Sequence, residues 1–201
     1  TGAGMVLNQI KPKKSDSIVI IGLGGIGFSA LIALVSLGVK EIFCVDIDKK
    51  KLIKAKSLGA KHVFDLSSKK RNEVVTSIKN ISQSDGVKFA IEAAGSTESI
   101  EFAFDCISNE GHCFFASHPQ YGDKIQIDPF DLIKGKKISG SWGGGSKPDE
   151  TIRELSRLLS VKSSELETLV DRYFGLGSIN LAVDDLRDRK INRAMIDLTN
   201  E

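Results

Sequence analysis

The stretch IVIIGLGGIGFSA, residues 18–30, constrains the fold of this chain more than any other feature. It runs from apolar and β-branched residues directly into Gly22, Gly24, Gly25 and Gly27, and returns at once to apolar residues. Glycine inside a helix or strand costs backbone entropy, so a cluster this dense marks a place where the backbone must adopt a shape that side chains would prevent. The stretch therefore predicts a buried strand, a tight turn and a helix in close succession.

Short apolar runs alternate with longer amphipathic ones from Ile18 to Ser141. This alternation is typical of repeated β-α units around a parallel sheet, whose strands are covered on both faces. We predict strands over residues 18–22, 41–46, 62–65, 87–92, 112–117 and 137–141, and helices over 25–37, 49–58, 69–81 and 98–107. After residue 141 the sequence predicts a helix ending near 159, a strand over 169–173, a helix over 180–188 and a last strand in RAMIDL.

These elements together predict an α/β fold. We expect a Rossmann-type doubly wound sheet of six parallel strands in the order 3-2-1-4-5-6, with helices on both faces. Residues 1–140 would form this domain, and residues 141–201 would form a C-terminal α+β segment. The connection between the fifth and sixth strands departs from the rhythm, because it holds two prolines, a short alternating segment KIQI and a weak helical pattern over 130–134.

Composition excludes several other classes of protein. The chain has 28 basic and 26 acidic residues, and its basic clusters KPKK and KKK are short, so we expect no nucleic-acid partner. No apolar run approaches the roughly 18 residues of a membrane span, and no signal peptide is evident, so we expect a cytoplasmic protein without membrane contact. The three cysteines show no CxxC pairing, and their spacings with His62, His112 and His118 fit no zinc pattern.

The glycine turn has the sequence of a diphosphate-binding turn. Gly22 would permit the bend, Gly24 would let backbone N–H groups approach a pyrophosphate, and Gly27 would let the helix press on the strand. The helix N-terminus adds free N–H groups and a positive dipole end. Asp46 ends the second predicted strand about 20 residues after Gly27, where a carboxylate accepts hydrogen bonds from the adenosine ribose and repels a 2′-phosphate. The pattern therefore predicts NAD rather than NADP.

Several features remain open on the residues alone. Asp48 fits an N-cap of the next helix, whereas Lys51 either faces solvent or reaches back to the ribose. The small residues at 93–95 and 116–117 either border the cofactor or form ordinary turns at the carboxyl ends of strands. Methyltransferases that bind S-adenosylmethionine also have a glycine-rich first turn and an acidic residue after the second strand, so a methyltransferase is one alternative. A non-catalytic dinucleotide-binding or sensing module is another.

Nearly the whole sequence resembles the C-terminal part of the medium-chain, zinc-containing alcohol dehydrogenases. The likeness is carried by TGAG at the start, GLGGIG followed by SA, VDIDKKKLIKAKSLGAKHVFD, the turn IEAAG and the ending INLAVDDLRDRKINRAMIDL. It implies an enzyme that transfers hydride between a small alcohol or polyol and NAD(H). It also implies a preceding catalytic domain that holds zinc in the full-length protein. We therefore assign no catalytic residue and no metal ligand to this chain, and we expect it to be inactive alone.

The resemblance assigns cofactor contacts residue by residue. It places the pyrophosphate at Gly22, Gly24, Gly25, Ile26 and Gly27, the ribose at Asp46 and Lys51, adenosine at Ala94, the nicotinamide carboxamide at Ala116, His118, Ser141 and Gly143, and the phosphates also at Arg193. Two positions depart from the family pattern: the family often has glycine at the position of Ser117 and a larger residue at the position of Gly143. On the residues alone, Arg193 is a surface charge.

The resemblance also implies a homodimer. The last predicted strand leaves an exposed sheet edge, and KIQID alternates as a pairing strand does, so we expect the dimer to form through residues 124–128 and the strand near Ile138. Residues after about Gly140 would pack against the preceding domain, and we expect exposed apolar surface there.

Overall fold

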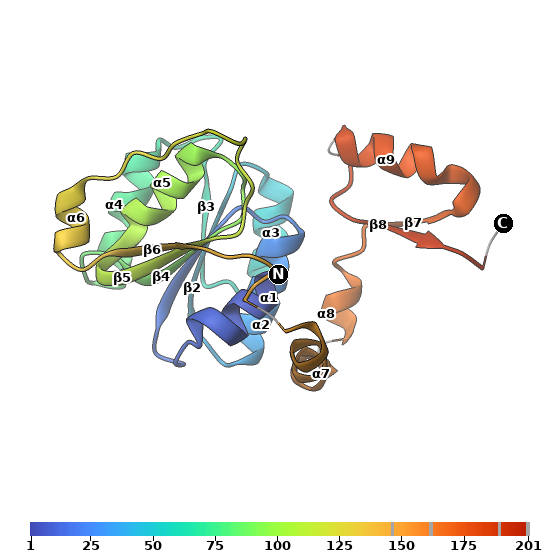
Figure 1. The fold of residues 1–201 in the computed structure, drawn as a ribbon, viewed down its shortest axis with the longest axis horizontal. Helices are drawn as coiled ribbons and strands as arrows, with labels where there is room; N and C mark the ends of the chain where they lie inside the picture. The colour runs from blue at the N-terminus through green and yellow to red at the C-terminus, as the bar shows by residue number, and fades with distance from the viewer. Residues whose placement is uncertain (146, 161–162, 189, 200–201) are drawn as a thin grey trace.

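The computed structural model describes residues 1–145, 147–160, 163–188 and 190–199, and it has the predicted α/β fold (Figure 1). The main sheet consists of β1 (Ser17–Ile21), β2 (Glu41–Asp46), β3 (His62–Asp65), β4 (Val87–Glu92), β5 (Ile107–Phe115) and β6 (Lys137–Gly140). All strands are parallel, in the order β3-β2-β1-β4-β5-β6. The order reverses between β1 and β4, and open sheets of this kind bind ligands beyond the carboxyl ends of the strands at that point.

Helices cover both faces of the sheet. They are α2 (Gly25–Ser36), α3 (Lys49–Ser57), α4 (Arg71–Ser82), α5 (Thr97–Cys106) and the short α6 (Pro129–Ile133). Ile18 and Ile20 of β1 belong to one apolar core with α2, whereas Val19 and Ile21 belong to a second core with α4 and α5. Because alternate residues of β1 enter opposite cores, the strand is buried on both faces, as its unbroken apolar run predicts.

The N-terminal residues form helical structure that the sequence analysis missed. A short helix α1 (Gly2–Gly4) continues directly into a π-helix, η1 (Met5–Ile10). The segment crosses α2 closely, because a Cβ atom added at Gly2 would lie 2.0 Å from the carbonyl oxygen of Ile26. The segment is shorter than the 11 to 18 residues over which a helical period becomes recognisable, so its pattern carried no signal.

Two of the predicted strands begin at other residues than expected. β5 begins at Ile107 rather than at residue 112, because Glu110 with φ of 64° and Gly111 form an irregularity inside the strand instead of a loop before it. The alternating segment KIQI forms no strand; the backbone N–H of Gln126 instead donates to the carboxylate of Glu101 at 2.7 Å. The strand predicted over 169–173 begins later, at Arg172.

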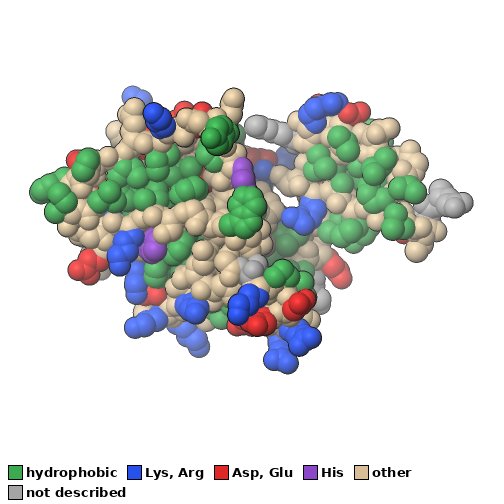
Figure 2. All heavy atoms as spheres, in the orientation of Figure 1, with side chains coloured by type: hydrophobic (Ala, Val, Ile, Leu, Met, Phe, Trp, Pro, Cys, Tyr) green, Lys and Arg blue, Asp and Glu red, His purple; other side chains and the backbone are tan. Residues whose placement is uncertain are grey.

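The C-terminal segment contains α7 (Pro148–Leu159), α8 (Ser163–Glu167), β7 (Arg172–Gly175), the 3-10 helix η3 (Leu176–Ser178), α9 (Ile179–Arg187) and β8 (Ala194–Asp197). α7 packs on α2, while β7 and β8 form a separate parallel pair that lies apart from the main sheet (Figure 1). Exposed apolar side chains gather on this part (Figure 2), and they include Tyr173, Leu176, Ile179, Val183, Met195 and Leu198. The apolar surface expected after Gly140 is therefore present.

Candidate functional site

The turn between β1 and α2 brings the glycines together at the carboxyl edge of the sheet. Gly22 has φ of 90°, and a Cβ atom there would lie 2.7 Å from the backbone nitrogen of Ala94. A Cβ atom at Gly27 would lie 2.0 Å from the carbonyl oxygen of Gly22. At Gly24, in contrast, an added Cβ atom would meet nothing within 4 Å. Packing therefore explains Gly22 and Gly27, whereas Gly24 faces open space.

The N-terminus of α2 points its free amides toward this space. Gly24 is the N-cap residue, no side chain caps the helix, and the first turn, which includes Gly25 and Ile26, has no acidic residue. The N–H groups of a first helical turn have no partner within the helix. The positive end of the helix dipole is thus not neutralised by the helix's own side chains, which is the arrangement that binds an anion.

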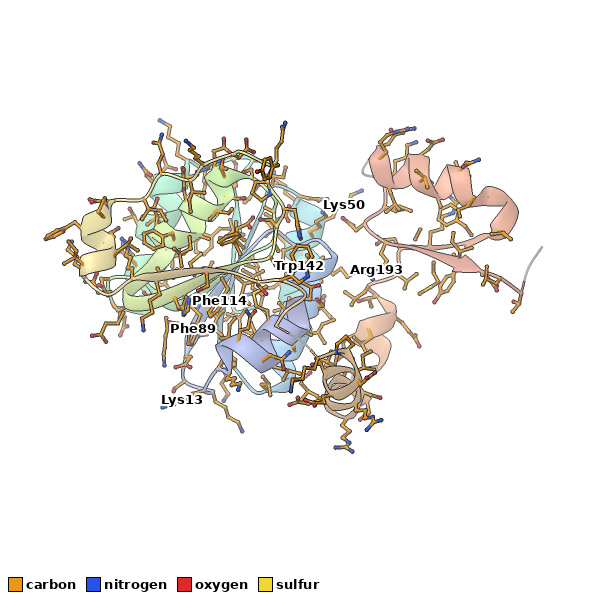
Figure 3. The ribbon with its side chains drawn as sticks, viewed as in Figure 1. Lys13, Lys50, Phe89, Phe114, Trp142 and Arg193 are labelled. Carbon is orange, nitrogen blue, oxygen red and sulfur yellow. The ribbon has the colours of Figure 1, made fainter. Side chains whose placement is uncertain are left out.

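Arg193 lies over the same helix end although it comes from the C-terminal segment (Figure 3). One of its guanidinium nitrogens lies 2.6 Å from the position that a Cβ atom of Gly25 would occupy. Within the part of the chain that the structure describes, Arg193 makes hydrogen bonds through its backbone, and its guanidinium makes no hydrogen bond or ion pair. A planar, unpaired guanidinium beside free helix amides suits a phosphate or diphosphate group.

Asp46 lies beside the glycine turn and is only 8% exposed. Its Oδ2 accepts a hydrogen bond from the backbone N–H of Leu23 at 2.6 Å, and its Oδ1 accepts one from the N–H of Asp48 at 2.9 Å. Each carboxylate oxygen has a second lone pair that a ribose hydroxyl can use. Asp48 caps α3, as the sequence predicts, because its side chain accepts from the N–H of Lys50 at 2.8 Å.

Two cavities border Asp46. The smaller one, about 180 Å³, runs between the carboxyl ends of β1, β2 and β4, and Ile47, Arg71 and Phe102 are among the residues that line it. The larger one, about 550 Å³, opens between α3 and the C-terminal segment, and its lining includes Lys50, Lys51, Lys54, Lys190, Asp171 and Asn192. Of the residues that line the larger cavity, the sequence analysis assigned only Asp46 and Lys51 to cofactor binding. No sequence motif connects the others.

Glu92 ties together the carboxyl ends of β4 and β5. It is fully buried, and its Oε1 accepts hydrogen bonds from the N–H groups of Ala94 at 2.7 Å and Gly95 at 2.8 Å and from the hydroxyl of Ser99 at 2.7 Å. Its Oε2 accepts the hydroxyl of Ser117. The carboxylate therefore fixes the turn that places Ala94 opposite Gly22.

The residues assigned to the nicotinamide lie at the ends of β5 and β6, on the same edge of the sheet as the glycine turn. The ring of His118 meets the exposed ring of Trp142 edge-on, with centroids 5.4 Å apart. The N–H of Ser141 already donates to the carbonyl oxygen of Phe115 at 2.8 Å, and its hydroxyl donates to Oε1 of Gln9 at 2.6 Å. Gln9 belongs to the unpredicted N-terminal helix.

The backbone around these residues is tightly built. The N–H of Ala116 donates to the carbonyl oxygen of Glu92 at 3.0 Å, so Ala116 extends β5 toward this edge. Gly143 has φ of 59° and begins a run of three glycines in left-handed conformations. The amide of Asn8 donates to the carbonyl oxygen of Gly144 at 3.2 Å. The N-terminal helix thus holds the loop after β6 in place.

Among the described residues, no group of three or more His, Cys, Asp or Glu side chains could hold a metal ion. The thiols of Cys44, Cys106 and Cys113 are buried, and burial raises the pKa of each one strongly. They therefore pack as small apolar side chains. No helix of the described part is long and apolar enough to cross a membrane.

Comparison with known proteins places these features in context. The profile of a family described as zinc-binding dehydrogenases matches residues 25–160. Alcohol dehydrogenase class-2 isozyme 2 of Oryctolagus cuniculus is 32% identical over 98% of this chain and 51% of its own length. Alcohol dehydrogenase 6 of Peromyscus maniculatus is 27% identical over 98% of this chain and 52% of its own length.

Solved structures agree with the curated relatives. Benzyl alcohol dehydrogenase from Acinetobacter calcoaceticus matches with a TM-score of 0.89 and 34% identity, over 98% of this chain and 53% of that chain. An alcohol dehydrogenase zinc-binding domain protein from Burkholderia ambifaria matches with a TM-score of 0.90 and 28% identity, over 98% of this chain and 52% of that chain. The chain thus spans about half the length of the relatives that it matches.

Proposed function

The chain belongs to the zinc-binding dehydrogenase family, and we propose that it is the NAD(H)-binding part of a zinc-dependent alcohol dehydrogenase that transfers hydride between an alcohol or polyol and NAD. The observation that carries this proposal is the open space at Gly24. It adjoins the free amides of the α2 N-terminus and the guanidinium of Arg193, which has no partner among the described residues. Steric packing of the chain does not account for a glycine there, whereas a diphosphate does.

The site fits each part of a dinucleotide. Gly22 to Gly27 and Arg193 would hold the diphosphate, and Asp46 with Lys51 would bind the adenosine ribose. The smaller cavity, with Ala94, Ile47 and Phe102 in its lining, suits the adenine ring, because its lining is mostly apolar. Ala116, His118, Ser141 and Gly143 would border the nicotinamide. When bound, the cofactor supplies the hydride acceptor.

The metal, and most of the pocket for the alcohol that donates the hydride, would be supplied by a second domain of the complete protein. The described residues contain no metal-binding cluster, and the relatives are about twice as long as this chain. Zinc held there would polarise the alcohol oxygen and lower its pKa. The exposed apolar face of the C-terminal segment, residues 141–201, gives such a domain a surface to cover, whereas residues 1–140 form the cofactor domain.

The same proposal includes a homodimer. β6 is one of the two edge strands of the main sheet, and residues 124–128 form no strand in the described structure. Phe130, Leu132 and Ile133 of the adjoining α6 are 57%, 46% and 77% exposed. Apolar side chains gather around α6 in Figure 2. An apolar patch beside an unpaired edge strand suits pairing with a second copy.

Calorimetric titration of the chain with NADH, NADPH and S-adenosylmethionine tests the cofactor assignment. We expect NADH to bind more tightly than NADPH, and S-adenosylmethionine not to bind. A folded chain that does not bind NADH, or that binds S-adenosylmethionine instead, contradicts the proposal. The alternative of a non-catalytic module is tested on the complete gene product, for which we expect bound zinc and NAD-dependent oxidation of alcohols.

A further inference from the structure

A carboxylate in the C-terminal segment holds the backbone that carries Arg193. Oδ2 of Asp171 accepts hydrogen bonds from the backbone N–H groups of Asn192 at 2.6 Å and of Arg193 at 3.0 Å. The N–H of Asp171 in turn donates to the carbonyl oxygen of Arg193 at 3.0 Å. Hydrogen bonds to an ionised carboxylate are roughly twice as strong as neutral ones. The carboxylate of Asp171 thus fixes the N–H of Arg193, while the backbone N–H of Asp171 fixes the carbonyl group.

The segment that contains Asp171 is itself tied to the main domain. The ammonium group of Lys54, in α3, donates to the backbone carbonyl of Thr168. Lys54, Asp171 and Asn192 also line the larger cavity beside Asp46. Thr168 and Asp171 are three residues apart in the chain, so the contact of Thr168 with α3 holds this segment near the main domain while Asp171 holds the backbone of Arg193. The side chain of Arg193 then returns to the main domain at Gly25.

This arrangement matters because arginine is a long side chain with many rotamers. Ordering it around a ligand costs conformational entropy, and a fixed backbone lowers that cost by limiting where the guanidinium can go. Residues 190–193 lie between α9 and β8, outside regular structure. The N–H groups of Lys190 and Ile191 donate to the carbonyl oxygen of Asp185 in α9, whereas those of Asn192 and Arg193 donate to the carboxylate of Asp171. Asp171 therefore holds the part of this segment that carries the arginine.

We propose that Asp171 is a positioning residue for diphosphate recognition, which aligns Arg193 over the N-terminus of α2 without binding the ligand itself. The inference rests on the proposed function, because the diphosphate is that of NAD(H). It predicts that removing this acidic residue lowers the affinity for an anion. Removing an acidic charge from the neighbourhood of an anion should strengthen anion binding by simple electrostatics, whereas loss of the Arg193 alignment should weaken it.

The test uses ligands with and without a diphosphate. NADH, ADP and adenosine are titrated into the unaltered chain and into Asp171→Ala, Asp171→Asn, Arg193→Ala and the double variant Asp171→Ala/Arg193→Ala. Asp197→Ala is the matched control, because Asp197 also accepts a backbone N–H, that of Thr199 at 2.9 Å, but at the far end of β8. Circular dichroism checks that every variant is folded.

We expect Asp171→Ala to weaken NADH and ADP binding roughly fivefold, the effect of one ordinary hydrogen bond, because the arginine is misaligned but still present, and to leave adenosine binding unchanged. Asp171→Asn should retain most of the affinity, since its amide oxygen can still accept both N–H groups. Asp171→Ala should add little to Arg193→Ala, because the two residues act through one guanidinium. Asp197→Ala should leave all three affinities unchanged.

Other outcomes overturn the proposal. Unchanged or tighter ADP binding by Asp171→Ala, equal weakening of adenosine, or full additivity with Arg193→Ala would each show that Asp171 does not act through Arg193. If Arg193→Ala binds NADH normally, Arg193 does not recognise the diphosphate and Asp171 has nothing to position. If the folded, unaltered chain binds neither NADH nor ADP, the proposed function itself fails.

Discussion

Oδ2 of Asp46 lies 2.6 Å from the backbone nitrogen of Leu23 and accepts its hydrogen bond. Asp46 ends β2, and Leu23 lies inside the glycine turn, so this bond joins the candidate ribose acid to the candidate diphosphate turn. Asp46 therefore shapes the turn through this hydrogen bond. In the proposed complex it would also present lone pairs and a negative charge to the ribose. These two effects respond differently to substitution.

Asp46→Ala removes both the acceptor for Leu23 and the negative charge, whereas Asp46→Asn retains one acceptor. We expect Asp46→Ala to lower the free energy of unfolding by about 1–3 kcal/mol, because it leaves buried N–H groups without partners. NADH affinity should fall roughly tenfold, and the preference for NADH over NADPH should narrow, because the charge that repels a 2′-phosphate is gone. Denaturant titration and calorimetry measure the two effects.

Asp48→Ala is the control for this prediction. It removes a neighbouring carboxylate that caps α3 and costs about 1 kcal/mol of stability. It should leave the NADH to NADPH ratio unchanged. A full preference for NADH in Asp46→Asn would show that the negative charge of Asp46 does not select the cofactor.

The glycines of the turn separate ligand binding from packing. Gly24→Ala adds a methyl group to open space, at a backbone conformation with φ of −85° that alanine adopts, so stability should change by less than about 0.5 kcal/mol. NADH affinity should nevertheless fall, because the methyl group would occupy the diphosphate position. Calorimetric titration and thermal unfolding check both expectations, and unimpaired NADH binding by Gly24→Ala would place the diphosphate elsewhere.

Gly27→Ala is the opposite case. Its methyl group would lie 2.0 Å from the carbonyl oxygen of Gly22, so the helix must move away from the strand. We expect a loss of about 1–3 kcal/mol of stability, the usual cost of overpacking. Denaturant unfolding measures it, and an unchanged midpoint would mean that the turn adjusts freely.

The features that sequence reasoning predicted are those encoded locally. The glycine turn, Asp46 and the alternation of strands and helices each depend on residues that are neighbours in the chain, so period and spacing reveal them. Asp171 and Gln9 illustrate what spacing does not reveal. Gln9 contacts Ser141, and Asp171 acts on Arg193, through folds of the chain that bring distant or irregular segments together. Arg193 itself was found only through family resemblance.

Glu92 should be the most sensitive polar residue for stability. Its carboxylate is fully buried and accepts hydrogen bonds from Ala94, Gly95, Ser99 and Ser117. Glu92→Ala leaves all of these donors without that partner, and we expect a loss of about 3 kcal/mol or more in the free energy of unfolding. Glu92→Gln should cost about 1 kcal/mol, since the hydroxyl of Ser117 can rotate to accept from the new amide. Equal stability of the two variants would contradict this account.

The stability of the chain should fall on mild acidification because of His112. Burial, with a smaller contribution from the nearby charge of Lys137, lowers the pKa of His112 below its ordinary value. The unfolded chain therefore takes up a proton near pH 6.5 before the folded chain does, so stability declines as the pH falls through and below that value. Neutral His112 pairs with the hydroxyl of Ser139 at 2.8 Å, which joins β5 to β6.

Denaturant titrations at pH 7.5, 6.5 and 5.5 measure this effect, with His112→Gln as the comparison. The other two histidines remain in the variant, so the difference between the two pH profiles isolates His112. We expect the profile of His112→Gln to be flatter below pH 6.5. Parallel profiles would show that the imidazole has the same proton affinity in the folded and unfolded chain.

The proposed homodimer depends on the edge of β6 and the apolar residues of α6. A charge in an apolar contact is costly, so Phe130→Asp/Ile133→Asp should convert a dimer into a monomer in light-scattering measurements. Ile53→Asp is the matched control, because Ile53 is 71% exposed on α3, which packs beside β3 at the opposite edge of the sheet. Ile53→Asp should leave the mass unchanged. A monomeric mass for the unaltered chain at high concentration would contradict dimerisation through these residues alone, since every element of the proposed contact is present in this chain.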